Sequence, residues 1–280
     1  MKNALSIDLE DCLCNEFLLR HIPADIDRGI VDDQVIKATD ALLKLLDKYH
    51  TKATFFVLGE IAAKHPDYIK MLHDCGHEIG SHTYSHTTLH KLGQKKFEEE
   101  LKDSTHLIKS IIHEQPLGFR APSFSVDQST AWVFDLLEKY GYKYDSSIFP
   151  VRTMIYGVPK APTMPYRPSL ADITKNDPGG KIIEFPLSVV RSFTNIPVSG
   201  GFYLRCLPPA LLNFSIRRIN KKKPAIIYIH PWEIYGDTIR VKSPFFVQFE
   251  AYYGIRSTYN KLEMLLKKYE FEPVRSVLGI

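Results

Sequence analysis

Short apolar runs alternate with longer stretches of helical periodicity along almost the whole chain, and this alternation restricts the fold more than any other feature. The apolar runs cover residues 4–7, 52–58, 77–81, 117–120, 142–145 and 225–229, with a last one at 271–274. Helical periodicity covers residues 33–49, 66–73, 94–113, 128–140, 208–219 and 259–269. An order of strand, helix, strand favours a parallel sheet with right-handed crossovers. The sequence therefore predicts an α/β fold.

The chain is long enough to form this fold as one unit. Its 280 residues are 44% hydrophobic, and α/β barrels of this length form single domains. We expect one domain over residues 1–280, with an irregular insertion at about 151–180 that acts as a functional loop or a lid. Residues 182–186 and 187–190 are expected to form a hairpin outside the main sheet.

Composition and charge argue against several classes of partner. The net charge is +4 and the basic residues are scattered, so we expect no nucleic-acid binding and at most a peripheral contact with membranes. No apolar run approaches the ~20 residues of a membrane span, and the N-terminus does not resemble a signal peptide, which predicts a cytoplasmic protein. The four cysteines, Cys12, Cys14, Cys75 and Cys206, are expected to be reduced core or loop residues.

Polar residues stand where successive apolar runs end. They are Asp8, His82, Arg120, Asp145 and His230. In a barrel the carboxyl ends of parallel strands meet on one face, where the active sites of such folds lie. The sequence therefore predicts that these side chains converge on one site.

Two histidines and an acidic cluster predict a metal site. His82 and His86 are four positions apart on a turn that is expected to enter a helix, so both can reach one ion. Asp8, Glu10 and Asp11 repel one another unless a cation or an arginine compensates their charge. A carboxylate with two histidines is a common ligand set for catalytic zinc and leaves one position open for water.

The other polar residues complete a hydrolytic site. A second carboxylate near the water can act as general base, and an arginine beside it can hold it ionised. A further histidine can protonate the leaving group. The combination predicts metal-assisted hydrolysis of an amide or an ester.

Five motifs in these segments resemble those of the polysaccharide deacetylases, the carbohydrate esterases with a NodB homology domain. In family order they are Ala4-Leu5-Ser6-Ile7-Asp8, His82-Thr83-Tyr84-Ser85-His86, Arg120-Ala121-Pro122-Ser123-Phe124, Asp145-Ser146-Ser147-Ile148-Phe149-Pro150 and Ile229-His230. The acidic segment 8–11, the stretch 197–205 and the segment 230–233 are most similar to the exosortase-associated subgroup. The resemblance implies a distorted (β/α) barrel with about seven parallel strands and a divalent metal, commonly zinc.

The resemblance also implies roles for individual residues. Asp8 would be the general base and Arg120 would restrain it. His230 would be the general acid, and Asp145 would tune it. The backbone N–H near Ser123 would help to hold the oxyanion.

The resemblance implies that His82 and His86 bind the metal, but the third protein ligand stays open. The family motif has two adjacent aspartates, whereas Leu9 follows the first acid here, so the ligand is Glu10 or Asp11. Strand alternation places Glu10 on the side of the general base, whereas Asp11 would need a bulge or a turn. We therefore prefer Glu10 slightly.

Substrate contacts are expected from two further segments and one tryptophan. Residues 200–203 either line the cleft or form a plain turn, and Trp232 either stacks on a sugar ring or packs in the core. The residues proposed to contact substrate are Pro122, Ser123, Phe124, Gly201, Tyr203 and Trp232.

The first functional hypothesis is a metal-dependent hydrolase that removes N-acetyl groups from amino sugars of a polysaccharide or a lipid-linked glycan, in the biosynthesis of a cell-surface glycan. A second hypothesis is the hydrolysis of a small N-acyl or ureido compound by the same residues. A third is a catalytically silent glycan-binding module. The complete set of predicted catalytic residues argues against the third.

Overall fold

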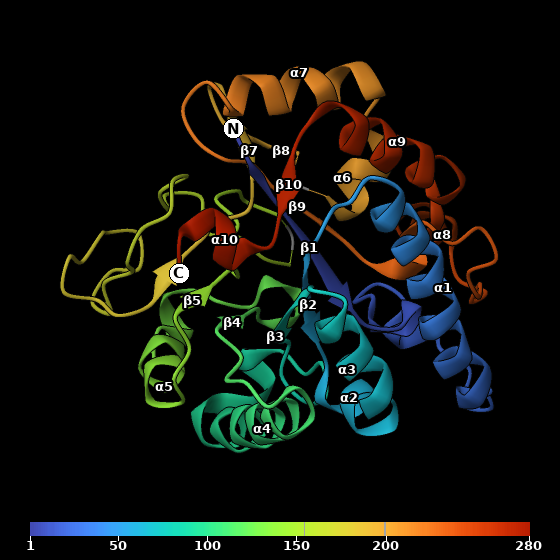
Figure 1. Cartoon of the computed structure of the whole chain (residues 1–280), viewed down its shortest axis with the longest axis horizontal. Coiled ribbons are helices and arrows are strands. Elements are labelled where there is room, and N and C mark those ends of the chain that lie inside the picture. Colours follow the sequence, from blue (N-terminus) through green and yellow to red (C-terminus); the bar gives the residue numbers. More distant parts are fainter. Residues whose placement is uncertain (154, 199) are drawn as a thin grey trace.

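A curved sheet of eight strands forms the centre of the computed structural model, which describes residues 1–153, 155–198 and 200–280 (Figure 1). The strands are β1 (Asn3–Leu9), β2 (Thr54–Val57), β3 (Glu78–Ser81), β4 (Gly118–Phe119), β5 (Tyr144–Asp145), β6 (Ile183–Glu184), β9 (Ile226–Ile229) and β10 (Phe271–Glu272). Their order is β10-β1-β2-β3-β4-β5-β6, with β9 paired to β1. The pairings within this sheet are parallel, as the sequence predicts.

Strand β1 is central because strands from both halves of the chain pair with it. All of its residues are buried, which agrees with an apolar run covered on both faces. Residues 6–9 pair with β2 on one edge, and residues 4–7 pair with β9 on the other. Strand β10 pairs with residues 3–4 of β1, on the same edge that pairs with β2 at residues 6–9. Strands β10 and β2 therefore share one position beside β1, and the eight strands occupy seven positions. In the described residues β6 and β9 do not pair, which leaves the barrel open there and confirms the predicted distorted barrel.

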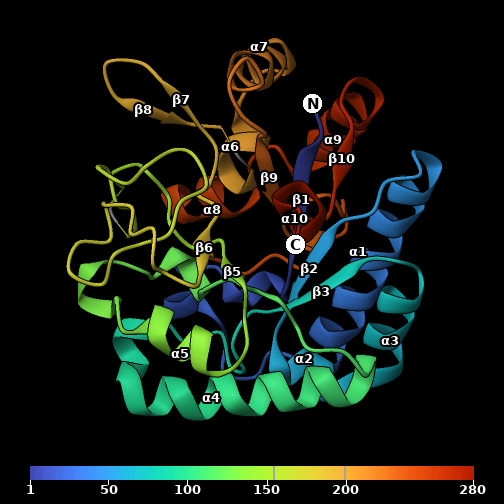
Figure 2. The same cartoon turned by 60° about the vertical axis from the view of Figure 1, so that its left-hand side comes forward.

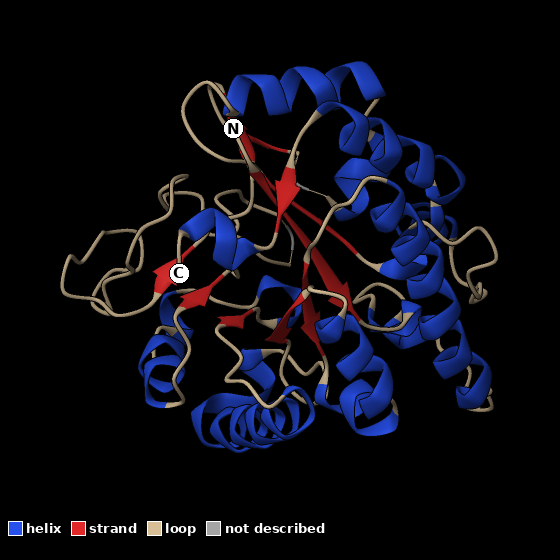
Figure 3. Ribbon diagram, in the orientation of Figure 1, coloured by secondary structure: helices blue, strands red, loops and turns tan. Residues whose placement is uncertain are grey.

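Helices cover the outside of the sheet (Figures 2 and 3). They are α1 (Arg28–Lys48), α2 (Gly59–Lys64), α3 (Pro66–Asp74), α4 (Leu89–Ile112), α5 (Val133–Lys139), α6 (Gly201–Cys206), α7 (Pro209–Ile219), α8 (Phe245–Tyr252), α9 (Ile255–Lys268) and α10 (Val274–Leu278). The largest core cluster joins β1 to α1 and α9 through residues such as Leu5, Leu42 and Leu265. Helix α1 begins five residues earlier than predicted, because the Asp27 side chain accepts hydrogen bonds from the first backbone N–H groups. No helix in the described part of the chain has the length and apolar character that a membrane crossing requires.

The predicted hairpin of residues 182–186 and 187–190 is wrong in its first strand. Ile183–Glu184 is β6 of the main sheet, because its backbone pairs with β5. The antiparallel hairpin lies further along the chain and consists of β7 (Val189–Arg191) and β8 (Asn195–Pro197). The expected strand at 271–274 is also shorter, since α10 begins at Val274 directly after Pro273.

The expected insertion at 151–180 forms turns and isolated bridges in its described part, and Met154 lies outside the described residues. Whether residues 1–280 act as a single domain stays a prediction.

Candidate active site

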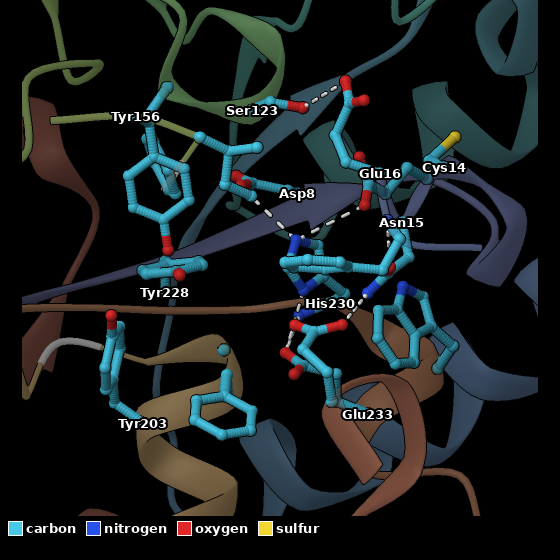
Figure 4. A pocket seen from close by; sticks show the side chains of 18 of the residues that line it. Asp8, Cys14, Asn15, Glu16, Ser123, Tyr156, Tyr203, Tyr228, His230 and Glu233 are labelled. Carbon is cyan, nitrogen blue, oxygen red and sulfur yellow. Dashed lines mark hydrogen bonds and ion pairs between the residues drawn. The ribbon is translucent and has the colours of Figure 1, made fainter. Parts of the chain in front are cut away.

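A cavity of about 330 Å³ opens at the carboxyl ends of β1, β3 and β9 (Figure 4). Strand β1 and the residues after it supply Asp8 and Glu10, the loop after β3 supplies His82 and His86, and the end of β9 supplies His230. Asp8 and His230, which are 222 positions apart in the sequence, therefore line one cavity. Of the five strand-end residues that the sequence predicts to converge, Asp8, His82 and His230 line the cavity, whereas Arg120 and Asp145 do not.

Arg120 lies beside Asp8 and is wholly buried. Its Nη1 donates to Asp8 Oδ1 at 2.6 Å and to Ser6 Oγ at 2.9 Å. Its Nε and Nη2 donate to the carbonyl and hydroxyl oxygens of Ser146 at 2.8 and 2.9 Å. The guanidinium also stacks over the Phe56 ring, 4.4 Å from the centroid. These contacts compensate the buried Asp8 carboxylate and fix its orientation.

The two predicted metal-binding histidines face the same carboxylate. Glu10 Oε2 lies 2.7 Å from His86 Nε2 and 3.5 Å from His82 Nε2. His82 Nδ1 is 2.7 Å from the Arg120 carbonyl oxygen. Donation to that carbonyl places the proton on Nδ1 and leaves the Nε2 lone pair directed at Glu10.

The histidine pair does not use the helical face that the sequence predicts. Residues 82–88 form an irregular loop, and α4 begins only at Leu89. Thr83 and His86 have positive φ angles of 66° and 58° within this loop, and both histidines line the cavity. The two imidazoles therefore meet through left-handed backbone rather than through helical spacing.

The geometry around Glu10 fits a divalent cation. Glu10 is 4% exposed, and its Oε2 is buried with no partner in hydrogen-bonding geometry. An orphaned, buried carboxylate oxygen beside two imidazole nitrogens is a suitable ligand set for a metal. Asp11 is occupied elsewhere, because its Oδ1 accepts from the Leu13 backbone N–H at 2.7 Å and caps a 3₁₀ turn. Glu10, His82 and His86 are the residues that would hold the metal.

The charges in this cluster perturb one another. Burial favours the neutral form of Glu10, but the neighbouring imidazoles of His86, His230 and His82 outweigh it and hold the pKa of Glu10 well below its usual value. Burial lowers the pKa of His86, and Glu10 more than reverses this, so the net shift is upward. Protons and a metal therefore compete for the same nitrogen atoms.

His230 is oriented by Glu233 rather than by Asp145. Nδ1 of His230 lies 2.8 Å from Glu233 Oε2, and the His230 backbone N–H donates to the same oxygen at 3.1 Å. Glu233 Oε1 accepts from Arg205 Nε at 2.6 Å, and both side chains are buried. Nε2 of His230 then lies 3.4 Å from Glu10 Oε1 and 3.9 Å from Asp8 Oδ2. Burial lowers the pKa of His230, but Glu10, Glu233 and Asp8 together raise it to about 9.

Asp145 therefore does not have the predicted role of tuning His230. Its Oδ1 accepts a short hydrogen bond from Ser147 Oγ. In the parallel register it stands next to Glu184 of β6. Burial raises the pKa of both carboxyls, and the charge of Asp145 raises that of Glu184 further. The two carboxyls form a separate buried pair, in which one shared proton would satisfy the unpartnered oxygens, Asp145 Oδ2 and Glu184 Oε2.

Five of the six predicted substrate-contacting residues line the cavity: Ser123, Phe124, Gly201, Tyr203 and Trp232. Pro122 is buried beside them and does not line the described cavity. Trp232 packs against its neighbours, the second of the two roles considered for it, since it is 4% exposed and its ring stacks on His230 with the centroids 5.3 Å apart. Gly201 has a φ of 52°, and a Cβ there would lie 2.6 Å from Tyr228 Oη, so the cavity wall needs a glycine at this position.

Sequence reasoning missed several residues of this wall. Glu233 and Arg205 were not assigned roles, although the glutamate follows His230 by three positions, a spacing that allows contact on a helical turn. Tyr156 comes from the irregular segment and Tyr228 from β9. For Cys14 the sequence favours a structural role over metal ligation, yet its sulfur lies within 4.8 Å of a Glu10 carboxylate oxygen and a His86 nitrogen.

Two family models match the chain. Residues 30–144 match "Polysaccharide deacetylase", and residues 146–279 match "Domain of unknown function (DUF3473)". His82, His86 and Arg120 lie in the first segment, whereas His230 and Glu233 lie in the second. The site thus draws on both segments and on residues that precede them.

Curated relatives are similar to parts of the chain. A peptidoglycan deacetylase of Helicobacter pylori is 38% identical over 126 residues, 45% of this chain and 41% of that protein. A peptidoglycan-N-acetylglucosamine deacetylase of Bacillus cereus is 33% identical over 91 residues, 32% of this chain and 33% of that protein. Chitin deacetylase 2 of Saccharomyces cerevisiae is 34% identical over 84 residues, 30% of this chain and 27% of that protein. The chain therefore spans less than half the length of each of these relatives.

A solved structure supports the fold. A Mycobacterium smegmatis crystal structure that is described as a polysaccharide deacetylase superposes with a TM-score of 0.59 at 19% identity. The superposition covers 97% of this chain and 86% of that one. The resemblance to the exosortase-associated subgroup stays a prediction.

Proposed function

Since the chain belongs to the polysaccharide deacetylase family, we propose that it is a metal-dependent hydrolase that removes N-acetyl groups from amino sugars of a polysaccharide or a lipid-linked glycan. The proposal agrees with the similar curated proteins, which are named as peptidoglycan or chitin deacetylases. The single observation that carries it is the placement of Asp8 and His230 beside the Glu10–His82–His86 cluster in one cavity. Hydrolysis of an amide needs a base for water and an acid for the amine, and these two residues supply both.

The metal would be zinc, held by Glu10, His82 and His86. When bound, such a metal supplies a Lewis acid that polarises the acetyl carbonyl and acidifies water. Nitrogen and carboxylate ligands with an open position are typical of catalytic zinc.

Asp8 acts as the general base. Its Oδ1 is occupied by Arg120 at 2.6 Å, so Oδ2 is the oxygen that takes a proton from the attacking water. Arg120 prevents the carboxylate from rotating, because it is held in turn by Ser6 and Ser146. The base is therefore oriented before substrate arrives.

His230 acts as the general acid. Glu233 accepts a hydrogen bond from Nδ1 of His230. The proton on Nε2 of His230 is therefore left facing the cavity, where the departing amine would lie. The raised pKa keeps this imidazole protonated near neutral pH. Proton donation to the amine makes it a better leaving group.

The backbone near Ser123 would contribute to the oxyanion site. Ser123 and Phe124 have consecutive positive φ angles of 51° and 50° at the cavity wall, and such backbone is often found at functional sites. The cavity also has aromatic walls, including Phe124 and Tyr203, that suit the apolar face of a sugar ring.

Acetate release tests the proposal directly. Zinc-reconstituted protein is incubated with N-acetylated glycans of the peptidoglycan and chitin types and, in parallel, with small N-acyl and ureido compounds. We expect acetate and a free amine from a glycan, and loss of both with Asp8→Asn. Turnover of the small compounds alone would favour the second hypothesis, and glycan binding without any turnover would favour the silent module.

A further inference from the structure

Cys14 lies at the cavity wall, close to the residues that would bind the metal. A 3₁₀ turn at Cys12–Cys14 follows the acidic cluster, and the Cys14 backbone N–H donates to the Asp11 carbonyl at 3.2 Å. Cys14 is the last residue of this turn and lines the cavity together with Asn15 and Glu16 (Figure 4). The Cys14 sulfur, a Glu10 carboxylate oxygen and a His86 nitrogen all lie within 4.8 Å of one another.

An independent feature indicates that this cluster suits a cation. Glu10 Oε2 is buried, points at both imidazoles and has no partner in hydrogen-bonding geometry. In tetrahedral zinc sites the ligand atoms are about 3.3–3.8 Å apart, as bond lengths of 2.0–2.3 Å require. A movement of the sulfur by about 1 Å would bring Cys14 into this range of Glu10 and His86, since its separation from those two ligand atoms is at most 4.8 Å.

The neighbouring cysteine shows what a purely structural thiol looks like here. Cys12 is 1% exposed, and its Sγ lies 3.5 Å from Gln34 Oε1 and 3.9 Å from the Ile239 carbonyl oxygen. It packs in a core cluster and does not line the cavity. The two thiols are two residues apart but lie in different environments, so one serves as a control for the other.

We propose that Cys14 is a further ligand of the metal held by Glu10, His82 and His86, and that it gives the site a preference for thiophilic divalent ions over magnesium and manganese. The inference rests on the proposed function for the metal itself. On binding, the thiol releases its proton to solvent and the sulfur forms one coordinate bond to the metal. Soft thiolate ligands favour zinc, cobalt and cadmium, whereas oxygen ligands favour magnesium and manganese.

A fourth protein ligand has a consequence for the open position. Zinc sites with three protein ligands keep a position for water, and catalytic zinc can expand to five ligands. Cys14 is the last residue of a three-residue turn and not part of a strand, so its sulfur would be the ligand that yields to water or substrate. The other three ligands are buried or nearly buried and keep the metal in place.

Cobalt substitution tests the inference without any measurement of turnover. Full-length protein, Cys14→Ser and Cys12→Ser are loaded with Co²⁺ and their absorption spectra are recorded. We expect a near-ultraviolet sulfur-to-cobalt charge-transfer band in the parent and in Cys12→Ser, and its loss in Cys14→Ser. Cadmium affinity, measured by chelator competition, should fall about 10- to 100-fold in Cys14→Ser, while manganese affinity changes little.

The outcomes separate this inference from the proposed function. If the parent binds cobalt but shows no charge-transfer band, or if the band persists in Cys14→Ser, Cys14 is not a ligand and the three-ligand site survives. If His82→Ala with His86→Ala leaves cobalt bound, the metal site itself is misplaced and both ideas fail. Thermal melts of the serine variants check that each is folded.

Discussion

Replacement of Glu233 by glutamine should move the pH dependence of turnover. The carboxylate accepts from His230 Nδ1 at 2.8 Å in a site where Glu233 is 1% exposed, so solvent screens the interaction little. A hydrogen bond to a charged group contributes about 1.5–3 kcal/mol, and 1.36 kcal/mol corresponds to one pKa unit. The pKa of His230 should therefore fall by about 1–2 units, because the acidic form loses its partner. In the parent, the raised pKa keeps His230 protonated as the pH rises. In Glu233→Gln the imidazolium should lose its proton at a lower pH, so activity should also be lost at a lower pH than in the parent.

The assay is a pH–rate profile of kcat and kcat/KM on an N-acetylated glycan. In Glu233→Gln the alkaline limb should shift downward by about 1–2 pH units, and turnover above neutral pH should fall about 10- to 100-fold. An aryl acetate, whose leaving group needs no proton, should show a smaller deficit. Glutamine keeps the size of the side chain and can still accept from Arg205, so the fold should persist.

Glu250 provides a matched control on the same wall. It lines the cavity, but its Oε2 accepts from Asn15 Nδ2 at 3.0 Å rather than from the histidine. Glu250→Gln should leave the alkaline limb in place. An unchanged limb in Glu233→Gln, or an equal shift in both variants, would refute the role given to Glu233.

Three further predictions concern the metal and the base. His82→Ala with His86→Ala should abolish the divalent metal found by elemental analysis, and the same metal content in the double variant would exclude this ligand set. Glu10→Gln should weaken metal affinity in chelator competition more than Asp11→Asn, because the Asp11 carboxylate already caps a turn; the opposite ranking would transfer the ligand role to Asp11. Asp8→Asn should keep the metal and lower turnover about 10²- to 10⁴-fold on the glycan and on the aryl acetate alike, since water must still be deprotonated. Near-normal turnover would exclude Asp8 as the base.

The convergence of polar residues could be predicted because it depends on periodicity. Apolar runs that end at Asp8 and at His230 specify parallel strands, and parallel strands place their carboxyl ends together. Alternation along β1 also anticipated that Glu10 lies on the side of Asp8, and both line the cavity. These inferences need only the periodicity of apolar and polar residues along the sequence and not the tertiary contacts.

The partner of His230 could not be predicted in the same way, because it depends on register. The sequence places residues 182–186 outside the main sheet, so it gives no reason to pair Asp145 with Glu184. In the structure β6 lies in parallel register with β5, and Asp145 stands beside Glu184. The position near His230 is then taken by Glu233, from the 3₁₀ turn that follows β9.

Backbone conformation was the other feature that the sequence did not predict. His86 lies in an irregular loop with a φ of 58°, and Ser123 has a φ of 51°. Positive φ is uncommon for residues other than glycine, and no composition rule marks these positions. Motif spacing therefore identified the histidine pair, although the helix expected to carry it does not form there.

The central position of β1 explains why one cavity can combine residues from distant segments. Strands β2 and β9 pair with opposite edges of β1, so the loop after β3 and the end of β9 lie on either side of Asp8. The cluster of Glu10 with the histidines then lies on the β3 side, and His230 with Glu233 lies on the β9 side. Arg120, from the end of β4, reaches across to Asp8 and fixes the base between them. Asp8 must serve water on one side while His230 serves the amine on the other, and the bond from buried Arg120 holds Asp8 Oδ1 in place so that Oδ2 remains for the water.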